Sequence, residues 1–198
     1  MELINFKKLN KLKPKKGRVL ISEPFLDDDY FKRSVVLICE HNEEGSFGFV
    51  LNNYMEFPLT EIMDDFPEFK TRISIGGPVN NDNLYYVHTV GEKITGSLEI
   101  LPGIYMGGSL DEMKSLIESN EIKESEIRFF VGYSGWSLGQ LENELKESAW
   151  IVSIADAETL MDTSIENLWK KILGEMGENH QLFSNYPEDP NLNLARFL

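Results

Sequence analysis

Apolar residues recur along the chain with two spacings, and each spacing predicts a different element. Alternating or continuous short apolar runs are typical of strands, while repeats of three and four residues are typical of helices. We expect strands at 18–22, 34–40, 47–52, 72–75, 84–88, 97–101, 104–106, 127–131 and 150–154. Helices are expected at 59–66, 109–120, 137–145 and 163–173. A polar Ser109, followed three residues later by Glu112, predicts a capping box that opens the second helix.

The order of these elements predicts the fold class. Strands 34–40 and 47–52 are joined by a short turn-forming segment, which favours an antiparallel hairpin. Most of the strands precede the helices in hairpin-spaced runs, instead of alternating with them one by one. This order favours an α+β fold over a doubly wound parallel sheet.

Charge divides the chain into two parts. Residues 1–18 carry seven Lys and Arg side chains against one Glu, while the whole chain has a net charge of −14, so the remainder carries −20. We expect a basic N-terminal arm at 1–16 and a single domain at 17–198 with an irregular tail after Gly174. The arm is either solvated or packed on the body through its apolar residues. Because the body repels phosphate backbones, we expect it to bind no DNA specifically.

Composition points to a cytoplasmic protein. No apolar run is long enough to span a membrane, and lysines interrupt the N-terminus where a signal peptide would be apolar. The only cysteine, Cys39, has no partner for an internal disulfide. Metal-binding and phosphate-loop spacings are missing, so we expect no metal, no cofactor and no membrane partner.

The segment from residue 127 to 150 is the most informative part of the chain. An apolar strand leads into a stretch rich in glycine and aromatic residues, and a capping-box pair, Ser137 with Gln140, then opens a helix. Gly132 and Gly135 predict a sharp turn that holds Tyr133 and Trp136 at its lip. Corners of this kind often carry ligands in proteins that mix helices and strands.

Four segments together resemble the AlgH/YqgE-type family of bacterial proteins. They are GRVLISEPFLDDDYFKRSVV from Gly17, EHNEEGSFGFVLN from Glu40, GGPVNNDNLYYVH from Gly76, and GYSGWSLGQLENELKESAW from Gly132. The resemblance implies an α+β domain with a curved, partly barrel-like, largely antiparallel mixed sheet and helices packed outside. It also implies a role in transcriptional regulation, which is attributed to one member, and carries over no catalytic residue. The lysine-rich arm before Gly17 is longer than the family pattern.

The sequence contains two arrangements of residues that could be catalytic. G-x-S-x-G at Gly132–Trp136 matches a nucleophile elbow, with Ser134 as the nucleophile. The bulk of Trp136 opposes this interpretation, and the family resemblance implies that alanine is accepted in place of Ser134. Cys39 and His41 lie two apart on a strand and so share a face, as a thiol and its base would. Inert core cysteine and histidine at a strand end are the simpler interpretation.

We therefore favour a binding or regulatory domain, with a hydrolase at the Gly132–Trp136 corner as the alternative and direct DNA binding as a disfavoured third. The partner is expected to be a protein or a small molecule. Small and aromatic residues at the corner would allow close approach, and Gln140 and Glu144 share a helix face that could supply polar contacts. The candidate binding residues are His41, Asn52, Gly76, Gly77, His88, Tyr133, Ser134, Gly135, Trp136, Gln140 and Glu144.

Overall fold

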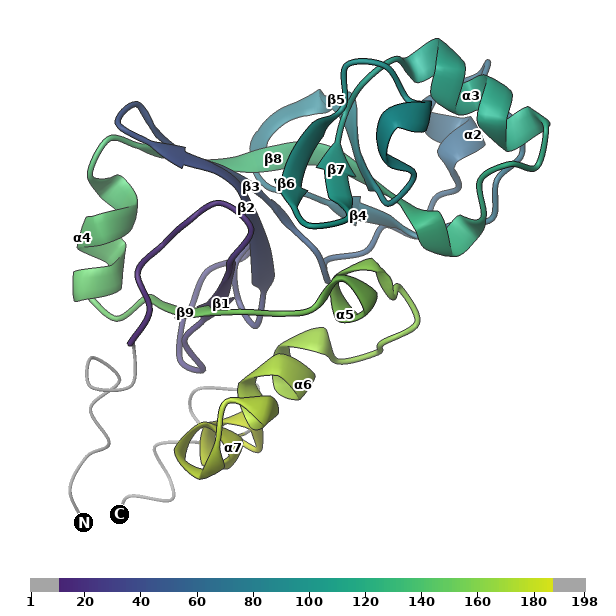
Figure 1. The fold of residues 1–198 in the computed structure, drawn as a ribbon. Helices are drawn as coiled ribbons and strands as arrows, with labels where there is room; N and C mark the ends of the chain where they lie inside the picture. The colour runs from purple at the N-terminus through teal and green to yellow at the C-terminus, as the bar shows by residue number, and fades with distance from the viewer. Residues whose placement is uncertain (1–10, 187–198) are drawn as a thin grey trace.

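A computed structural model describes residues 11–186, and its nine strands form one mixed sheet (Figure 1). Neighbouring strands follow the order β6-β7-β5-β8-β3-β2-β1-β9, all antiparallel, and β4 pairs with β8 in parallel. In chain order the strands are β1 (Val19–Ser22), β2 (Val35–Asn42), β3 (Gly45–Val50), β4 (Ile73–Ile75), β5 (Val79–His88), β6 (Leu98–Leu101), β7 (Ile104–Met106), β8 (Ile127–Ser137) and β9 (Trp150–Ser153).

Six α-helices and two 3-10 turns complete the described part of the chain. They are α2 (Leu59–Ile62), α3 (Leu110–Glu118), α4 (Gln140–Lys146), α5 (Ala157–Met161), α6 (Leu168–Glu175), α7 (Glu178–Ser184), η1 (Gly91–Lys93) and η2 (Glu124–Glu126). The predicted α+β class is confirmed, as is a largely antiparallel mixed sheet with helices outside it. The sheet remains open and does not close into a barrel.

Strand β8 joins three apolar cores because it is long and almost wholly buried. Phe130 packs in the core beneath α6 and α7, and Phe129 packs in the core of α2 and α3. Trp136, at the other end of the strand, belongs to the core beneath α4. Figure 1 shows β8 crossing the molecule between the group that holds α4 and the group that holds α2 and α3.

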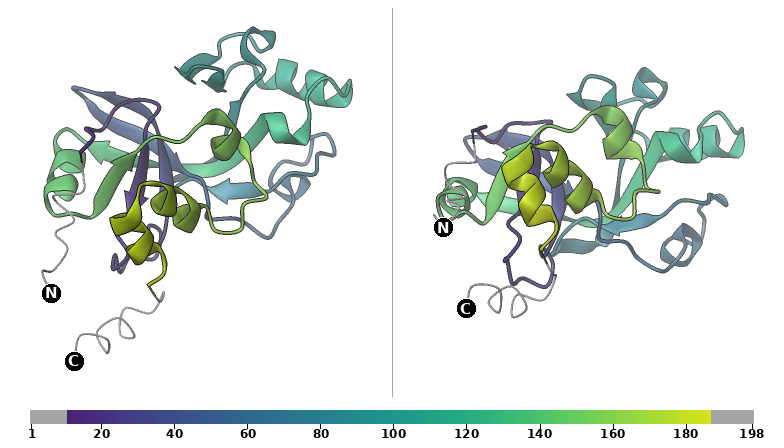
Figure 2. Two further views of the ribbon diagram at one scale, coloured as in Figure 1. Left: turned by 60° about the horizontal axis from the view of Figure 1, so that its bottom comes forward. Right: turned by 90° about the horizontal axis from the view of Figure 1, so that it is seen from below.

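The side chains of β1 and β2 alternate between the two faces of the sheet. Val19 and Leu37 point into the core that contains Trp169 of α6, whereas Leu20 and Val36 point into the core under α4. Both faces are therefore covered, which explains why these strands read as continuous apolar runs. Figure 2 shows α6 and α7 lying together over the strands near the N-terminus.

All nine predicted strand ranges overlap an observed strand, and the hairpin of β2 with β3 is confirmed. The helix predictions were weaker. The α6 helix begins at Leu168, not near residue 163, because Asn167 caps it by accepting a hydrogen bond from the Lys170 backbone. The chain after Gly174 was expected to be irregular, yet it forms α7, which buries Phe183. The expected arm lies mostly outside the described residues, which begin at Lys11.

Candidate functional site

The Gly132–Trp136 segment is a strand interior and not the predicted turn. Its residues pair with β3 on one side, with Gly135 opposite Phe47, and Tyr133 pairs with Val79 of β5 on the other. Pairing with β3 continues the strand as far as Ser137. The chain turns only afterwards, at Leu138 and Gly139. Leu138 is 74% exposed.

The nucleophile-elbow interpretation of Ser134 is wrong for the same reason. A nucleophilic serine needs an exposed hydroxyl at a strand-to-helix turn, but Ser134 is completely buried. Its Oγ donates a hydrogen bond to the carbonyl oxygen of Gly76, 2.9 Å away. Ser134 therefore ties β8 to the segment after β4.

Gly76 and Gly77 allow their own backbone to approach the backbone of β8, and they do not provide space for a ligand. A Cβ atom at Gly76 would lie 2.3 Å from the carbonyl oxygen of Gly132, and one at Gly77 would lie 2.4 Å from backbone atoms of Tyr133. Gly77 also has a φ of +152°, a conformation that side chains rarely adopt. Both glycines are buried against β8 and are closed to a partner.

The Glu144 carboxylate links the end of β8 to α4 and β9 through hydrogen bonds. One carboxylate oxygen accepts hydrogen bonds from both indole N–H groups, Trp136 at 2.8 Å and Trp150 at 2.7 Å. The other oxygen accepts from the Gln140 side chain at 3.0 Å. Gln140 in turn accepts from the backbone of Ser137, so only one half of the predicted capping box forms. We call Trp136, Gln140, Glu144 and Trp150 the indole clamp.

His41 and Cys39 do not form a catalytic pair. His41 Nδ1 is hydrogen-bonded to Ser46 Oγ at 2.8 Å, and its Nε2 lies 3.8 Å from a carboxylate oxygen of Glu142. The Cys39 thiol is buried and directed to the carbonyl oxygen of Leu37. Burial raises the pKa of this thiol far above its ordinary value, so it remains protonated and inert.

His88 and Asn52 lie away from the end of β8 and serve the fold. His88 is fully buried, and its Nε2 is hydrogen-bonded to Ser97 Oγ at 3.0 Å and to the Gly107 carbonyl oxygen at 3.1 Å. Burial lowers the pKa of His88, which favours the neutral imidazole. Asn52 accepts a hydrogen bond from the Val35 backbone and donates one to the carbonyl of Arg33. Neither side chain joins the other candidates.

A hollow remains on the surface beside the predicted corner. It has a volume of about 270 Å³ and lies at the ends of β2 and β3 where they meet β8. Tyr133 is half-buried here, with its ring 4.9 Å from that of Phe47. Exposed Glu40 and Glu44 stand at the rim. We call this site the hairpin-end hollow, lined by Glu40, Asn42, Glu44, Gly45, Ser46, Phe47, Tyr133 and Trp136.

A larger groove, which the sequence reasoning missed, runs along α5 and has a volume of about 870 Å³. The sequence signal that could have pointed to this region is Arg128, a charged residue inside an apolar strand. It is 1% exposed and donates hydrogen bonds to the carbonyl oxygens of Leu51 and Leu160. We call this site the α5 groove, lined by Lys70, Thr71, Arg72, Thr89, Glu124, Ser125, Ala157, Glu158, Met161, Asp162, Thr163 and Ser164.

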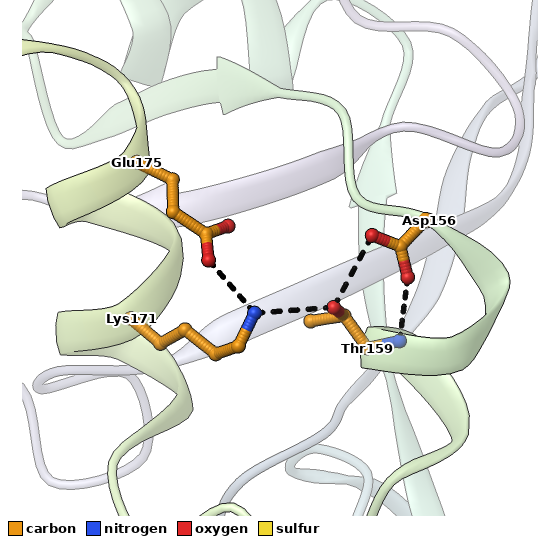
Figure 3. A network of polar contacts seen from close by, with 4 residues as sticks. All are labelled: Asp156, Thr159, Lys171 and Glu175. Atoms are coloured by element: carbon orange, nitrogen blue, oxygen red, sulfur yellow. Dashed lines mark hydrogen bonds and ion pairs between the residues drawn. The ribbon is translucent and has the colours of Figure 1, made fainter.

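A polar network beside the α5 groove resembles a lysine-assisted nucleophile but is structural (Figure 3). Lys171 Nζ donates to Thr159 Oγ1 at 3.3 Å and to Glu175 at 2.8 Å, and Thr159 contacts Asp156. The hydrogen bond to Glu175 raises the pKa of Lys171, so the lysine keeps its proton and cannot act as a base. Asp156 caps α5 by accepting from the Thr159 backbone, and the network joins α5 to α6.

Residues 11–186 offer neither a cluster of metal ligands nor a membrane-spanning helix. Within that part of the chain, His, Cys, Asp and Glu side chains do not gather in threes as a metal site would require. No helix in the same described stretch has the length and apolar character needed to cross a bilayer.

Relatives and solved structures cover almost the whole chain. A UPF0301 protein of Pelodictyon phaeoclathratiforme is 42% identical over 91% of this chain and 97% of its own length. A UPF0301 protein of Bacteroides fragilis is 42% identical over 93% of this chain and 94% of its own. The solution structure of the AlgH protein from Pseudomonas aeruginosa has a TM-score of 0.69 at 30% identity, covering 89% of this chain and 98% of that one.

A crystal structure of a Corynebacterium diphtheriae protein shares the fold at 23% identity, with a TM-score of 0.75 over 91% of this chain and 97% of that one. The family model described as AlgH-like matches residues 19–181, which include every strand of the sheet. The resemblance carried by the four sequence segments is thus confirmed over most of the chain. This protein belongs to the AlgH-like family.

Proposed function

We propose that this protein is a non-catalytic binding domain that recognises a cationic side chain of a partner protein at the hairpin-end hollow. The observation that carries the proposal is the combination of two exposed carboxylates and three aromatic side chains around one surface hollow. The residues that suggested catalysis support a binding role by elimination. Ser134 is buried, Cys39 is protonated, and His41 is hydrogen-bonded to Ser46.

The lining of the hollow suits an ammonium or guanidinium group. A cation gains from the faces of aromatic rings such as Tyr133 and Phe47, and it gains further from a nearby carboxylate. Asn42 donates to Glu40 at 2.9 Å and accepts from the backbone of Glu44, so the rim is already ordered before a partner arrives. A volume of about 270 Å³ accommodates one long side chain.

The net charge of −14 supports the same choice of partner. An acidic protein attracts basic proteins over a distance of about one Debye length, roughly 8 Å at physiological salt, and repels nucleic acid. We therefore propose that any regulatory role, including the regulation of transcription, acts through a protein and not through specific DNA contact by the acidic body.

The proposal is tested by NMR titration of the full chain with a tetralysine peptide. We expect salt-sensitive amide shifts around Glu40, Phe47 and Tyr133, and we expect their loss in the double variant Glu40→Gln/Glu44→Gln. The matched control is Glu56→Gln/Glu118→Gln, which removes the same charge from exposed positions outside the hollow. Equal binding by the two double variants would show that the peptide senses only net charge and would overturn the proposal.

A further inference from the structure

The α5 groove is lined by two cationic side chains, Arg72 and Lys70, that form no close ion pair with the described residues. Arg72 lies over the ring of Tyr54, with its guanidinium carbon 3.6 Å from the ring centroid, and it donates to the carbonyl of Thr163 at 3.1 Å. Arg128, which is buried and does not line the groove, donates to the hydroxyl of the same tyrosine at 3.3 Å. Among residues 11–186, neither arginine has a carboxylate oxygen within 4.0 Å.

Two arginines around one tyrosine repel each other, and burial prevents water from screening that repulsion fully. Arg128 is enclosed, and its Nε has no hydrogen-bond partner. Arg72 is exposed at the groove and uses one of its N–H groups in the contacts of the described chain, which leaves most of its planar donor fork open. Exposed Lys70, two residues away in the sequence, also lines the groove.

Three carboxylates, Glu124, Glu158 and Asp162, also line the groove. Glu158 and Asp162 come from α5 and the residue that follows it. Asp162 is held by the backbone and hydroxyl of Ser164, at 2.8 Å and 2.6 Å, while Glu158 is exposed. The lining also includes five threonine and serine residues, namely Thr71, Thr89, Ser125, Thr163 and Ser164. A groove of about 870 Å³ with this lining is suited to a polar metabolite.

We propose that the α5 groove binds a small zwitterionic molecule. Its anionic group, a phosphate or a carboxylate, pairs with Arg72 and Lys70, because a planar guanidinium fork matches both groups. Its amine lies toward Glu158 and Asp162. These carboxylates exclude ligands with several anionic groups, so one negative and one positive group is the combination that the groove accepts. This site is independent of the hairpin-end hollow.

Isothermal titration of the full chain with matched probes tests the proposal. Phosphoethanolamine and β-alanine carry both groups, whereas inorganic phosphate and ethanolamine carry one each. We expect at least one of the two zwitterions to bind about tenfold or more tightly than either single-charge probe. If inorganic phosphate binds as well as both zwitterions, or if neither zwitterion binds in the millimolar range, the proposal is overturned.

Variants assign the two ends of the ligand. Arg72→Gln should weaken zwitterion binding by about tenfold or more, because a charge-assisted hydrogen bond is lost. If the Arg72→Gln variant does not fold, Lys70→Gln, at an exposed position, tests the same cationic part of the groove. Glu158→Gln should weaken binding of the zwitterion and leave binding of inorganic phosphate unchanged. Lys93→Gln removes an exposed charge outside the groove and should change nothing. Equal weakening by Lys93→Gln, or amide shifts confined to the hairpin-end hollow, would refute this site.

Discussion

Two charged side chains anchor the opposite ends of β8, and they do so in opposite ways. Glu144, at the end near α4, accepts hydrogen bonds from donors that lie within eight residues of it in sequence. Arg128, at the other end, donates to carbonyls that are 32 and 77 residues away. One anchor is a local cluster, and the other is made by the tertiary fold.

The two ends also differ in what they leave for a ligand. The carboxylate of Glu144 is occupied by two indoles and an amide, so it has little capacity for further partners. At the other end of β8, Arg128 is buried, and the exposed Arg72, which packs on the tyrosine that Arg128 contacts, keeps most of its donor fork open to the groove. A conspicuous sequence motif can therefore be a finished structural cluster, while an inconspicuous charge in a strand lies near the groove that we propose as a binding site. Substitutions at the two anchors distinguish the finished cluster from the open groove.

Replacement of Trp136 by alanine should lower the free energy of unfolding by about 3–5 kcal/mol, the usual range for a buried tryptophan. Trp136 is 5% exposed, and its ring lies 6.0 Å from that of Trp150. Urea denaturation measures the change. Leu138→Ala is the control, because Leu138 is two residues away but exposed, and the expected change is within about 0.5 kcal/mol. Equal effects would show that the clamp is not packed and that Trp136 acts as a surface residue.

Replacement of Arg128 by methionine should lower the free energy of unfolding by about 2–3 kcal/mol. Methionine fills much of the volume but leaves the buried carbonyl of Leu160 without the guanidinium donor, and hydrogen bonds to charged groups contribute about 1.5–3 kcal/mol. Arg128→Lys keeps the charge but loses the planar donor fork, so its free energy of unfolding should lie between those of the parent and the methionine variant. A methionine variant as stable as the parent would mean that desolvation of the charge cancels its hydrogen bonds.

Replacement of Glu144 by glutamine should lower the free energy of unfolding by about 1–2 kcal/mol. The amide oxygen can still accept from an indole, but the amide NH₂ then faces the donor group of Gln140. Chemical denaturation followed by tryptophan fluorescence reports both stability and the surroundings of the two indoles. Glu147→Gln, an exposed change at the end of α4, should have almost no effect. If both variants behave alike, the hydrogen bonds of the clamp contribute nothing measurable.

The sequence predicted the sheet far better than the site. Strand positions followed from apolar runs, since β1 and β2 are covered on both faces. The turn predicted at Gly132–Gly135 was wrong because the left-handed φ of Gly132, +68°, occurs inside β8 and does not end the strand. Gly132 also allows the approach of Gly77, whose carbonyl oxygen would lie 2.7 Å from an added Cβ. Short helices such as α5 and α7 contain too few turns to show a period, and packing stabilises them.

The candidate residues divide according to sequence distance. The relation of Gln140 and Glu144 was evident from their i, i+4 spacing, but their use inside the fold depended on two indoles turning toward them. Tyr133 and Trp136 are the candidates that line a surface hollow, together with Phe47, which no local pattern connects to them. The α5 groove was beyond reach because its walls come from residues 70–72, 89, 124–125 and 157–164.

The smallest expected effect concerns His88, which resembles Arg128 in one respect and differs in another. Both are buried bases with a nitrogen that has no hydrogen-bond partner, but the imidazole can lose its charge while the guanidinium keeps it. Burial lowers the pKa of His88 below its ordinary 6.5, so the unfolded chain binds the proton more readily than the folded one. Stability is therefore fully present above about pH 6.5 and is lost as the pH falls toward the pKa of the folded state. His88→Gln should reduce the drop in urea midpoint between pH 7.5 and 5.5, and His180→Gln should act in the same direction, because burial also lowers the pKa of His180. An unchanged drop in both variants would mean that the folded protein accommodates charged imidazoles as easily as it accommodates Arg128.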